Sequence, residues 1–251
     1  MQRYFTNEIY KEKSSYGISG EDYHHIVHVM RMKEGSKFYL VFSNHVTIQA
    51  EITAVNNQEV IVKEIAKEKQ EKELPLAVTI ACGYSKGNKF DWLVQKATEL
   101  GAAEFIGFPA ETSVVKWDQK KLAKKQERLA KITQEAAEQS QRNLLPEVTL
   151  LASIQELLAA FSQFDHILVA YEESAKQDET ATLARLLEKV QANSRVLAIF
   201  GPEGGFSEKE IESFTQNQAV LCGLGPRILR AETAPLYLLS AISYHLELLK
   251  Q

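Results

Sequence analysis

Two glycine-rich segments in the last third of the chain hold the residues best suited to chemistry. Residues 199–207 read Ile-Phe-Gly-Pro-Glu-Gly-Gly-Phe-Ser, and residues 224–234 read Leu-Gly-Pro-Arg-Ile-Leu-Arg-Ala-Glu-Thr-Ala. Each segment lies at the end of a short apolar run typical of a buried strand and leads into a helical pattern. In an open α/β sheet, ligands bind beyond the carboxyl ends of the strands. The two segments therefore predict one small-molecule pocket that is lined mostly by backbone.

The composition of these segments narrows the kind of ligand. Neither the glycine-lysine pattern that cradles a triphosphate nor the Gly-x-Gly-x-x-Gly of a dinucleotide site is present. The segments also have few lysines and offer no pair of aspartates for magnesium. A flat, uncharged group such as an adenine ring, read by backbone amides and apolar side chains, fits better. A single glycine segment is more often a plain strand-to-helix turn, and the second segment strengthens the functional interpretation.

The polar residues near these segments have both functional and structural interpretations. Arg230 would stabilise developing negative charge and Glu232 would accept a proton, or the two form a loop salt bridge. Arg142, at the end of a long charged helix, suits either a phosphate contact or the helix C-terminus. His24 and His28 have the i, i+4 spacing of zinc ligands, but no third ligand follows at a suggestive spacing, which favours a solvated helix face. We therefore expect no metal site, and no nucleophile elbow supports a serine-histidine mechanism.

Composition is ordinary for a globular protein of 251 residues, with 45% apolar and 25% charged residues, in one large domain or two smaller ones. Cys82 and Cys222 are too few for a disulfide framework, which favours a reducing cytoplasm. The N-terminus lacks the apolar core of a signal peptide, and polar residues interrupt the apolar run near the C-terminus, which disfavours a membrane span. Because the net charge is -4, any RNA contact must use local basic patches.

A change in pattern divides the chain. Residues 64–75 are charged with alternating signs and end in a proline, which is typical of a linker, although a solvated strand end has the same composition. After this segment, strand-like and helix-like patterns alternate, which predicts a parallel sheet covered on both faces. We therefore expect a small domain over residues 1–72 and an α/β domain over residues 73–251. Short segments rich in β-branched or aromatic residues make the first domain β-rich, namely 37–42, 47–55 and 59–63.

Three helices of the second domain are well marked in the sequence. Residues 120–140 form a long charged helix with an apolar inner stripe, and Ser207 with Glu210 forms a capping box. Residues 233–249 form a helix with almost no polar face. Such a helix must be buried on both sides, either as a central helix of one chain or at a subunit interface.

The two glycine segments together resemble those of the SPOUT superfamily of S-adenosylmethionine-dependent RNA methyltransferases. The whole chain resembles the RsmE family, which methylates N3 of a uridine in bacterial small-subunit 16S ribosomal RNA. Ala231, where many relatives have threonine, is a mild departure. The matching pieces stand in family order, at residues 3–5, 24–31 with Gly35, 96–101, 138–142, 201–205 and 224–234.

The resemblance implies a PUA-like β-barrel for RNA binding, followed by a SPOUT methyltransferase domain with a C-terminal trefoil knot, in a homodimer. It implies S-adenosylmethionine as cofactor and small-subunit rRNA, free or in the 30S particle, as partner. Arg230 would stabilise charge, and Glu232 and Glu203 are candidate bases, with deprotonation by water left open. RNA would contact Arg3, His25, Arg31 and Arg142. The expected cofactor-binding residues are Ala170, Tyr171, Glu172, Ile199, Phe200, Gly201, Gly204, Leu221, Gly223, Leu224, Gly225, Ile228, Leu229, Thr233 and Ala234.

Two other functions remain open from the sequence. One is a non-enzymatic RNA-binding factor that docks on ribosomes during assembly, and it predicts no cofactor binding. The other is a SPOUT methyltransferase that acts on a ribose 2′-hydroxyl or on transfer RNA. The sequence does not identify the nucleotide.

Overall fold

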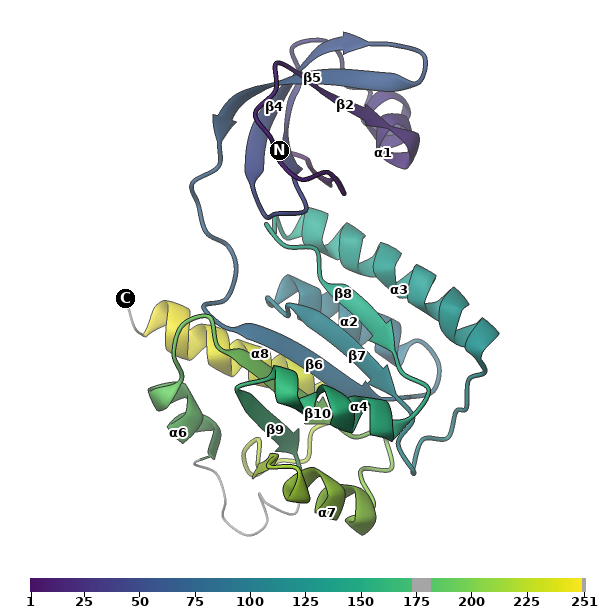
Figure 1. The fold of residues 1–251 in the computed structure, drawn as a ribbon, viewed down its shortest axis with the longest axis vertical. Coiled ribbons are helices and arrows are strands. Elements are labelled where there is room, and N and C mark those ends of the chain that lie inside the picture. Colours follow the sequence, from purple (N-terminus) through teal and green to yellow (C-terminus); the bar gives the residue numbers. More distant parts are fainter. Residues whose placement is uncertain (173–181, 250–251) are drawn as a thin grey trace. The chain divides into compact units, whose positions relative to one another are not determined.

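The computed structural model describes residues 1–172 and 182–249, which form two compact units (Figure 1). The first unit comprises Met1–Lys72 and Ala137–Leu145, and the second comprises Glu73–Ala136 and Pro146–Gln251. The chain thus leaves the first unit after residue 72 and returns to it for nine residues between positions 137 and 145.

The first unit is built on one five-stranded sheet with strand order β1-β3-β4-β5-β2. Strand β1 pairs with β3 in parallel, and the other neighbours are antiparallel. Two register shifts between β4 and β5 bend the sheet around an apolar core that includes Phe38, Ile48 and Val60. The strands are β1 (Arg3–Phe5), β2 (Tyr16–Ser19), β3 (Lys37–Val41), β4 (Thr47–Val55) and β5 (Glu59–Lys67).

The segment expected as a linker is partly strand. Residues 64–67 continue β5, so the alternative of a solvated strand end describes them better. Strand β5 pairs with β4 as far as Lys67, and the following Glu68 is bound to Arg3 and Lys72. The alternating charges of this segment therefore reflect a strand with one exposed face and an ion-paired end.

Between β2 and β3 lies a short helix, α1 (Gly20–His24), which continues as one π-helical turn over His25–Val29. The turn ends near Arg31, which has a positive φ of 52°. A non-glycine residue in this left-handed conformation is uncommon and ends the helical run.

The second unit is a six-stranded sheet with order β11-β9-β10-β6-β7-β8, and every neighbouring pair is parallel. This confirms the α/β fold with a parallel sheet. The strands are β6 (Ala77–Gly83), β7 (Glu104–Phe108), β8 (Glu147–Leu150), β9 (His166–Ala170), β10 (Arg195–Phe200) and β11 (Val220–Cys222). The trefoil knot that the resemblance implies stays a prediction.

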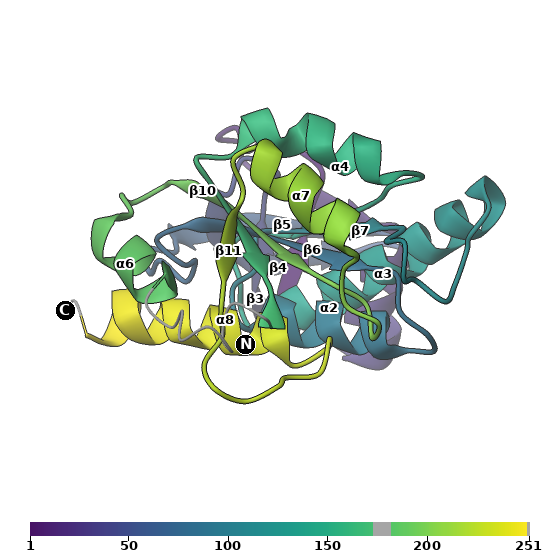
Figure 2. The same cartoon turned by 90° about the horizontal axis from the view of Figure 1, so that it is seen from below.

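Helices cover both faces of this sheet (Figure 2). One face packs against α2 (Lys89–Glu99), α3 (Gln119–Gln139), α6 (Thr182–Lys189) and α8 (Ala234–Ser243). The other face packs against α4 (Ile154–Ala160), the 3₁₀ turn Phe161–Gln163 and α7 (Glu208–Gln216). The predicted capping box at the start of α7 is present, with Ser207 and Glu210 bonding each other's backbone. No helix in the described part of the chain is both long and apolar enough to cross a membrane.

The C-terminal helix α8, with the π-helical turn Tyr244–Leu248 that follows it, is covered on one side within the chain. Leu239 and Ile242 are in the core, whereas 40% of Tyr237 and 55% of Tyr244 are exposed. The helix is therefore not buried on all sides within the described chain, and the subunit interface stays a prediction.

Candidate functional site

A cavity of about 810 Å³ lies beyond the carboxyl ends of β9, β10 and β11 in the second unit. Both glycine segments line it, as the sequence predicts. Strand β9 lies between β10 and β11 in the sheet. The loops that follow these three strands are therefore brought together. The cavity is therefore where an open parallel sheet binds ligands.

Backbone conformation shapes the wall of this cavity. A Cβ on Gly201 would lie 3.0 Å from the carbonyl carbon of Gly205, so only glycine lets the segment fold back on itself. Gly225 has a φ of 88°, which other residues rarely adopt. The hydroxyl of Thr112 donates to the carbonyl oxygen of Gly205 at 2.5 Å and braces the first segment.

Most of the predicted cofactor-binding residues line the cavity. The structure places there Ala170, Tyr171, Glu172, Phe200, Gly201, Gly204, Leu224, Gly225, Ile228, Leu229 and Ala234. Residues that the sequence did not single out also line it, among them Lys89, Pro202, Phe206 and Arg227.

Four predicted cofactor-binding residues lie elsewhere. Ile199 and Leu221 belong to the core on the face covered by α4 and α7, because side chains alternate along a strand and Phe200 takes the opposite face. Gly223 is buried but does not line the cavity. Thr233 is exposed at the N-cap of α8 and makes no side-chain cap bond.

The residues that line the cavity suit a ligand with one flat, uncharged group and one polar group. Backbone of the glycine segments and the side chains of Phe200, Leu224 and Leu229 supply apolar walls. The charged residues that line the cavity are Lys89, Glu172, Glu203, Arg227, Arg230 and Glu232. A Cβ at Gly201 would crowd the cradle that the first segment forms. These features fit S-adenosylmethionine, whose adenine would take the apolar walls and whose charged amino acid would take the polar ones.

Lys89 links the two candidate bases. Its ammonium Nζ donates to Oε1 of Glu203 at 2.8 Å and lies 4.0 Å from Oε2 of Glu232. The hydrogen bond to Glu203 raises the pKa of Lys89. Partial burial acts to raise the pKa of Glu203, but the hydrogen bond and positive charge of Lys89, together with backbone hydrogen bonds, outweigh it and the pKa is lowered.

The carboxylate of Glu232, unlike that of Glu203, has a buried oxygen that lacks a hydrogen-bond donor. Its Oε2 is buried and accepts no hydrogen bond in the described part of the chain. A buried carboxylate oxygen without a donor is costly, so such an atom calls for a functional explanation. Glu232 lines the main cavity and also a small void of about 10 Å³ beside it, which Ser85 and Lys89 share.

Arg230 is exposed and lines the cavity. Within the described residues, no ion pair joins it to Glu232, so the alternative of a loop salt bridge between these two residues is wrong. The carboxylate of Glu232 faces Lys89 instead.

Lys89 was not expected at the site from the sequence. It begins α2, the helix that follows β6, and β6 is the neighbour of β10 in the sheet. A local signal exists, since Ser-Lys-Gly-Asn-Lys stands at the carboxyl end of a predicted strand. The partner carboxylates lie more than 100 residues along the chain, and the sequence alone does not bring them to it.

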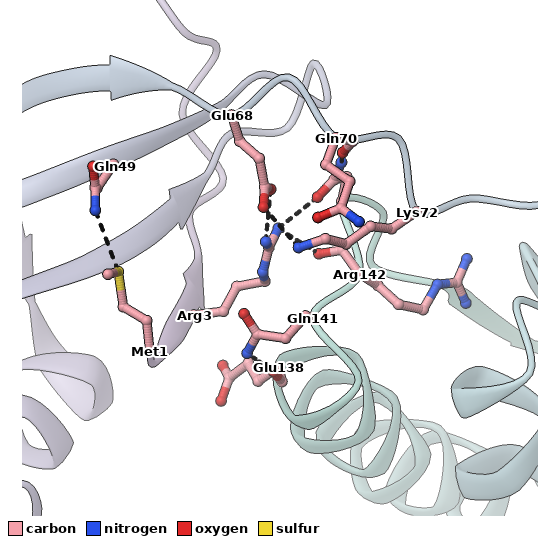
Figure 3. Close-up of polar contacts among 10 residues, drawn as sticks. Met1, Arg3, Gln49, Glu68, Gln70, Lys72, Glu138, Gln141 and Arg142 are labelled. Atoms are coloured by element: carbon pink, nitrogen blue, oxygen red, sulfur yellow. Dashed lines mark hydrogen bonds and ion pairs between the residues drawn. The ribbon is translucent and has the colours of Figure 1, made fainter.

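Arg3, expected on the RNA-binding surface, is instead buried in the first unit (Figure 3). Its guanidinium donates to Oε2 of Glu68 at 2.6 Å, to Oδ1 of Asn143 at 2.5 Å and to the carbonyl oxygen of Arg142 at 3.0 Å. Lys72 also binds Glu68 at 2.6 Å. Arg3 thus ties β1 to the end of β5 and to residues 142–143, and it has no surface left for a phosphate.

Of the other three residues predicted to contact RNA, one is buried and two are accessible. Arg142 is 2% exposed, and its guanidinium is turned away from Arg3 in Figure 3. Arg3 and Arg142 are therefore both buried rather than exposed to solvent. His25 is partly exposed and its Nδ1 lies 3.0 Å from the hydroxyl of Tyr4, and Arg31 is exposed. Of the four residues, His25 and Arg31 are available to a partner.

Metal ligation is not supported by any cluster in the described part of the chain, where no group of three or more histidine, cysteine, aspartate or glutamate side chains is placed to hold an ion. The rings of His24 and His28 lie 5.0 Å apart on the exposed face of the first unit.

Two family models match the chain. An RNA methyltransferase domain matches residues 72–243, and an RNA methyltransferase PUA domain matches residues 18–65. Solved structures share the fold. A Legionella pneumophila methyltransferase in complex with SAM is 28% identical, with a TM-score of 0.80 over 96% of both chains. A ribosomal RNA small subunit methyltransferase E from Neisseria gonorrhoeae bound to S-adenosyl methionine is 24% identical, with a TM-score of 0.82 over 97% of both chains.

A curated relative is closer in sequence. The ribosomal RNA small subunit methyltransferase E of Bacillus subtilis is 48% identical over 253 aligned positions, which cover 100% of this chain and 99% of that protein. The identity extends over both units, and the RNA methyltransferase model includes both glycine segments and Lys89. The chain belongs to the ribosomal RNA small subunit methyltransferase E family.

Proposed function

We propose that this protein transfers a methyl group from S-adenosylmethionine to N3 of a uridine in 16S ribosomal RNA of the small subunit. Family membership makes it an S-adenosylmethionine-dependent rRNA methyltransferase. The observation that supports the finer proposal is that the buried Oε2 of Glu232, beside a glycine-lined cavity, accepts no hydrogen bond in the described part of the chain. N3 of uridine carries a weakly acidic proton, and its lone pair becomes nucleophilic once that proton leaves.

The cofactor would be held by the glycine segments. The Legionella relative has SAM bound, and the lining of the cavity suits the same molecule. S-adenosylmethionine, when bound, supplies a methyl group already activated on a sulfonium. The tasks left to the protein are to position the base, to remove the N3 proton and to stabilise negative charge on the uracil oxygens.

Glu232 is the better candidate for accepting the proton. Glu203 already accepts a hydrogen bond from Lys89, and its lowered pKa makes it a weaker base. Lys89, at 4.0 Å, faces Glu232 without bonding it at hydrogen-bond distance, so a lone pair of Glu232 remains available. In this scheme the N3–H bond would break first and the proton would pass to a carboxylate oxygen of Glu232. The electron pair left on N3 would then form the bond to the methyl carbon, while the bond from sulfur to that methyl breaks and its electron pair stays on sulfur.

Arg230 would stabilise the uracil anion. Its side chain is exposed at the cavity and, in the described part of the chain, carries no ion pair that would have to be broken. A guanidinium offers several donors in a fixed plane, which suits the oxygens beside N3. The base must also be unpaired or flipped to present N3.

The first unit would bind RNA around His25 and Arg31. Its PUA match supports this role, and both residues are accessible. A protein that acts on ribosomal RNA works where ribosomes are assembled, which makes the cytoplasm the proposed location.

A homodimer is part of the proposal. Tyr237 in α8 is exposed, and so are Tyr244 and Leu248 in the π-helical turn that follows, with Leu248 64% exposed. The helix begins directly after the second glycine segment, so a second copy packed on it would also order that segment.

The proposed function is tested by incubating the protein with labelled S-adenosylmethionine and small-subunit rRNA, both free and in 30S particles. Wild type is expected to label the RNA. Glu232→Gln is expected to lower the rate by about 10²–10⁴-fold, the usual contribution of a general base, while calorimetry with S-adenosylhomocysteine shows unchanged binding. Glu212→Gln, which removes an exposed carboxylate of α7, is the control and should retain activity.

Two outcomes would contradict the proposal. Binding of rRNA without any methyl transfer would favour a non-enzymatic assembly factor. Full activity of Glu232→Gln would remove that residue from the proton transfer and leave water as the acceptor.

A further inference from the structure

The segment from Lys116 to Lys131 carries the largest local excess of positive charge in the chain. It contains seven lysines and arginines and two acidic residues, a net charge of +5 within a chain whose net charge is -4. The remaining residues therefore carry a net charge of -9. This segment leads into and forms most of α3 in the second unit.

The cations gather on one face of the helix. At about 100° per residue, Lys120, Lys124, Arg128 and Lys131 fall within an arc of about 80°. The opposite side holds Leu122 and Leu129, which are buried in the core of the second unit. The basic face defined by Lys120, Lys121, Lys124, Arg128 and Lys131 is exposed along about 17 Å of helix.

This arrangement works against the helix itself. Lys120 with Lys124, Lys121 with Lys125, and Lys124 with Arg128 are like-charge pairs at i, i+4, which destabilise a helix. The first turn of α3 has no acidic residue, so Lys120 and Lys121 also stand near the positive end of the helix dipole. An ordinary solvated helix face alternates its charges, and this one does not.

Several members of the segment are already engaged. Arg128 binds Oδ2 of Asp91 at 2.9 Å, and Lys125 lies over the ring of Trp117 at 4.5 Å. Asp118, one of the two acidic residues of the segment, accepts a hydrogen bond at its Oδ1 from the backbone N–H of Lys121 at the start of α3. Within the described residues, no ion pair joins a carboxylate to Lys120, Lys121 or Lys124.

We propose that the basic face of α3 is a docking surface for the backbone phosphates of the RNA substrate. This proposal rests on the proposed function, which identifies RNA as the negatively charged partner. Arg3 and Arg142 are buried, and a protein of net charge -4 must draw its phosphate contacts from local patches. The lysines point to a ligand of repeating single charges, since lysine binds phosphate as a point charge and carries no base specificity.

The test compares three variants of the full-length protein for binding to a 16S rRNA transcript. Lys120→Gln/Lys121→Gln/Lys124→Gln removes three charges from the basic face. Arg185→Gln/Lys189→Gln/Lys209→Gln removes three exposed charges from α6 and α7 and is the matched control. A third variant replaces Lys120, Lys121 and Lys124 with arginine and keeps the charge.

Affinity is measured by fluorescence anisotropy between about 50 and 200 mM KCl. The α3 glutamine variant is expected to weaken binding about tenfold. It should also make the plot of log affinity against log salt shallower by about two to three units, because three phosphate contacts are lost and each contributes about 0.7–0.9. The control and the arginine variant should keep the wild-type slope. The melting temperature of the glutamine variant should be equal to or above that of wild type, since like-charge repulsion is relieved.

An unchanged salt slope in the α3 glutamine variant, or an equal loss in the control, would overturn the proposal. A loss of binding to polyglutamate with no loss of RNA binding would also overturn it and identify an acidic protein as the partner. These results are independent of methyl transfer. Wild type that binds RNA through α3 but labels no RNA would contradict the proposed function alone, and active wild type with α3-independent binding would contradict this inference alone.

Discussion

Lys89 donates a hydrogen bond to Glu203 across 114 positions of sequence, at 2.8 Å, at the edge of the cavity that the glycine segments line. The same ammonium lies 4.0 Å from Glu232, so one cation hydrogen-bonds one carboxylate and faces the other only as a longer ion pair. Neighbouring groups that make two carboxylates unequal are the usual way in which a site separates their roles.

The pairing predicts a pH dependence. The pKa of Glu203 is below its ordinary value of 4.5, so the pair stabilises the fold at pH above that value and loses this contribution as pH falls through the lowered pKa. Lys89→Gln should raise the pKa of Glu203 and lower the melting temperature at neutral pH, with the difference from wild type shrinking below pH 4.5. Melting curves across this range check it, and a difference that does not vary with pH would contradict the pairing.

A matched pair of glycines tests the cofactor cradle. Gly225 lines the cavity with a φ of 88°, and Gly35 in the first unit has a φ of 83°, where a Cβ would have no neighbour within 4 Å. Alanine at either position should cost about 1–2 kcal/mol of folding free energy, because both need the left-handed conformation. Gly225→Ala should also weaken S-adenosylhomocysteine binding at least about tenfold, whereas Gly35→Ala should not. Equal affinities by calorimetry would remove the second segment from the cofactor site.

Arg3 is expected to matter for stability. Arg3→Met leaves the buried carboxylate of Glu68 with Lys72 as its remaining ion partner, and it should destabilise the first unit by about 2–4 kcal/mol. Lys13→Gln breaks an exposed pair with Glu8 at 3.0 Å and should cost less than about 1 kcal/mol. Amide hydrogen exchange in β1 and β5 measures both effects. Unchanged exchange in Arg3→Met together with weaker RNA binding would restore the surface role expected from the sequence.

The C-terminal helix gives a prediction about assembly. Tyr244→Glu should produce monomers, because a charge buried at an interface costs several kcal/mol. Val114→Glu, at a residue 62% exposed outside α8, is the control and should leave the mass unchanged. Leu239→Glu is unsuitable, since Leu239 is in the core of its own chain and its replacement should unfold the protein. Light scattering reports the mass, and a monomeric wild type would refute the dimer.

The features that the sequence predicted are local ones. The long helix expected at residues 120–140 is α3 (Gln119–Gln139), because apolar residues such as Leu122 and Leu129 repeat on one face. The capping box at Ser207 and the glycine segments follow from residues that are adjacent in sequence. The parallel sheet follows from the alternation of strands and helices, which constrains topology strongly.

The features that the sequence did not predict depend on distant partners. Arg3 is bound to residues about 140 positions away, so nothing around it distinguishes a buried arginine from a phosphate-binding one. Lys89 and Glu232 belong to different elements that meet only when the sheet is assembled. The resemblance implies Ile199 and Leu221 as cofactor-binding residues, but the alternation of side chains along a strand turns both side chains to the other face of the sheet.

Nucleoside analysis tests methyl transfer to N3 of uridine most directly. RNA labelled by the wild-type protein with methyl-labelled S-adenosylmethionine is digested to nucleosides and separated by chromatography with mass detection. We expect the label to be recovered in 3-methyluridine. Label in a ribose 2′-O-methylated nucleoside, or in a methylated base other than uridine at N3, would contradict the claim.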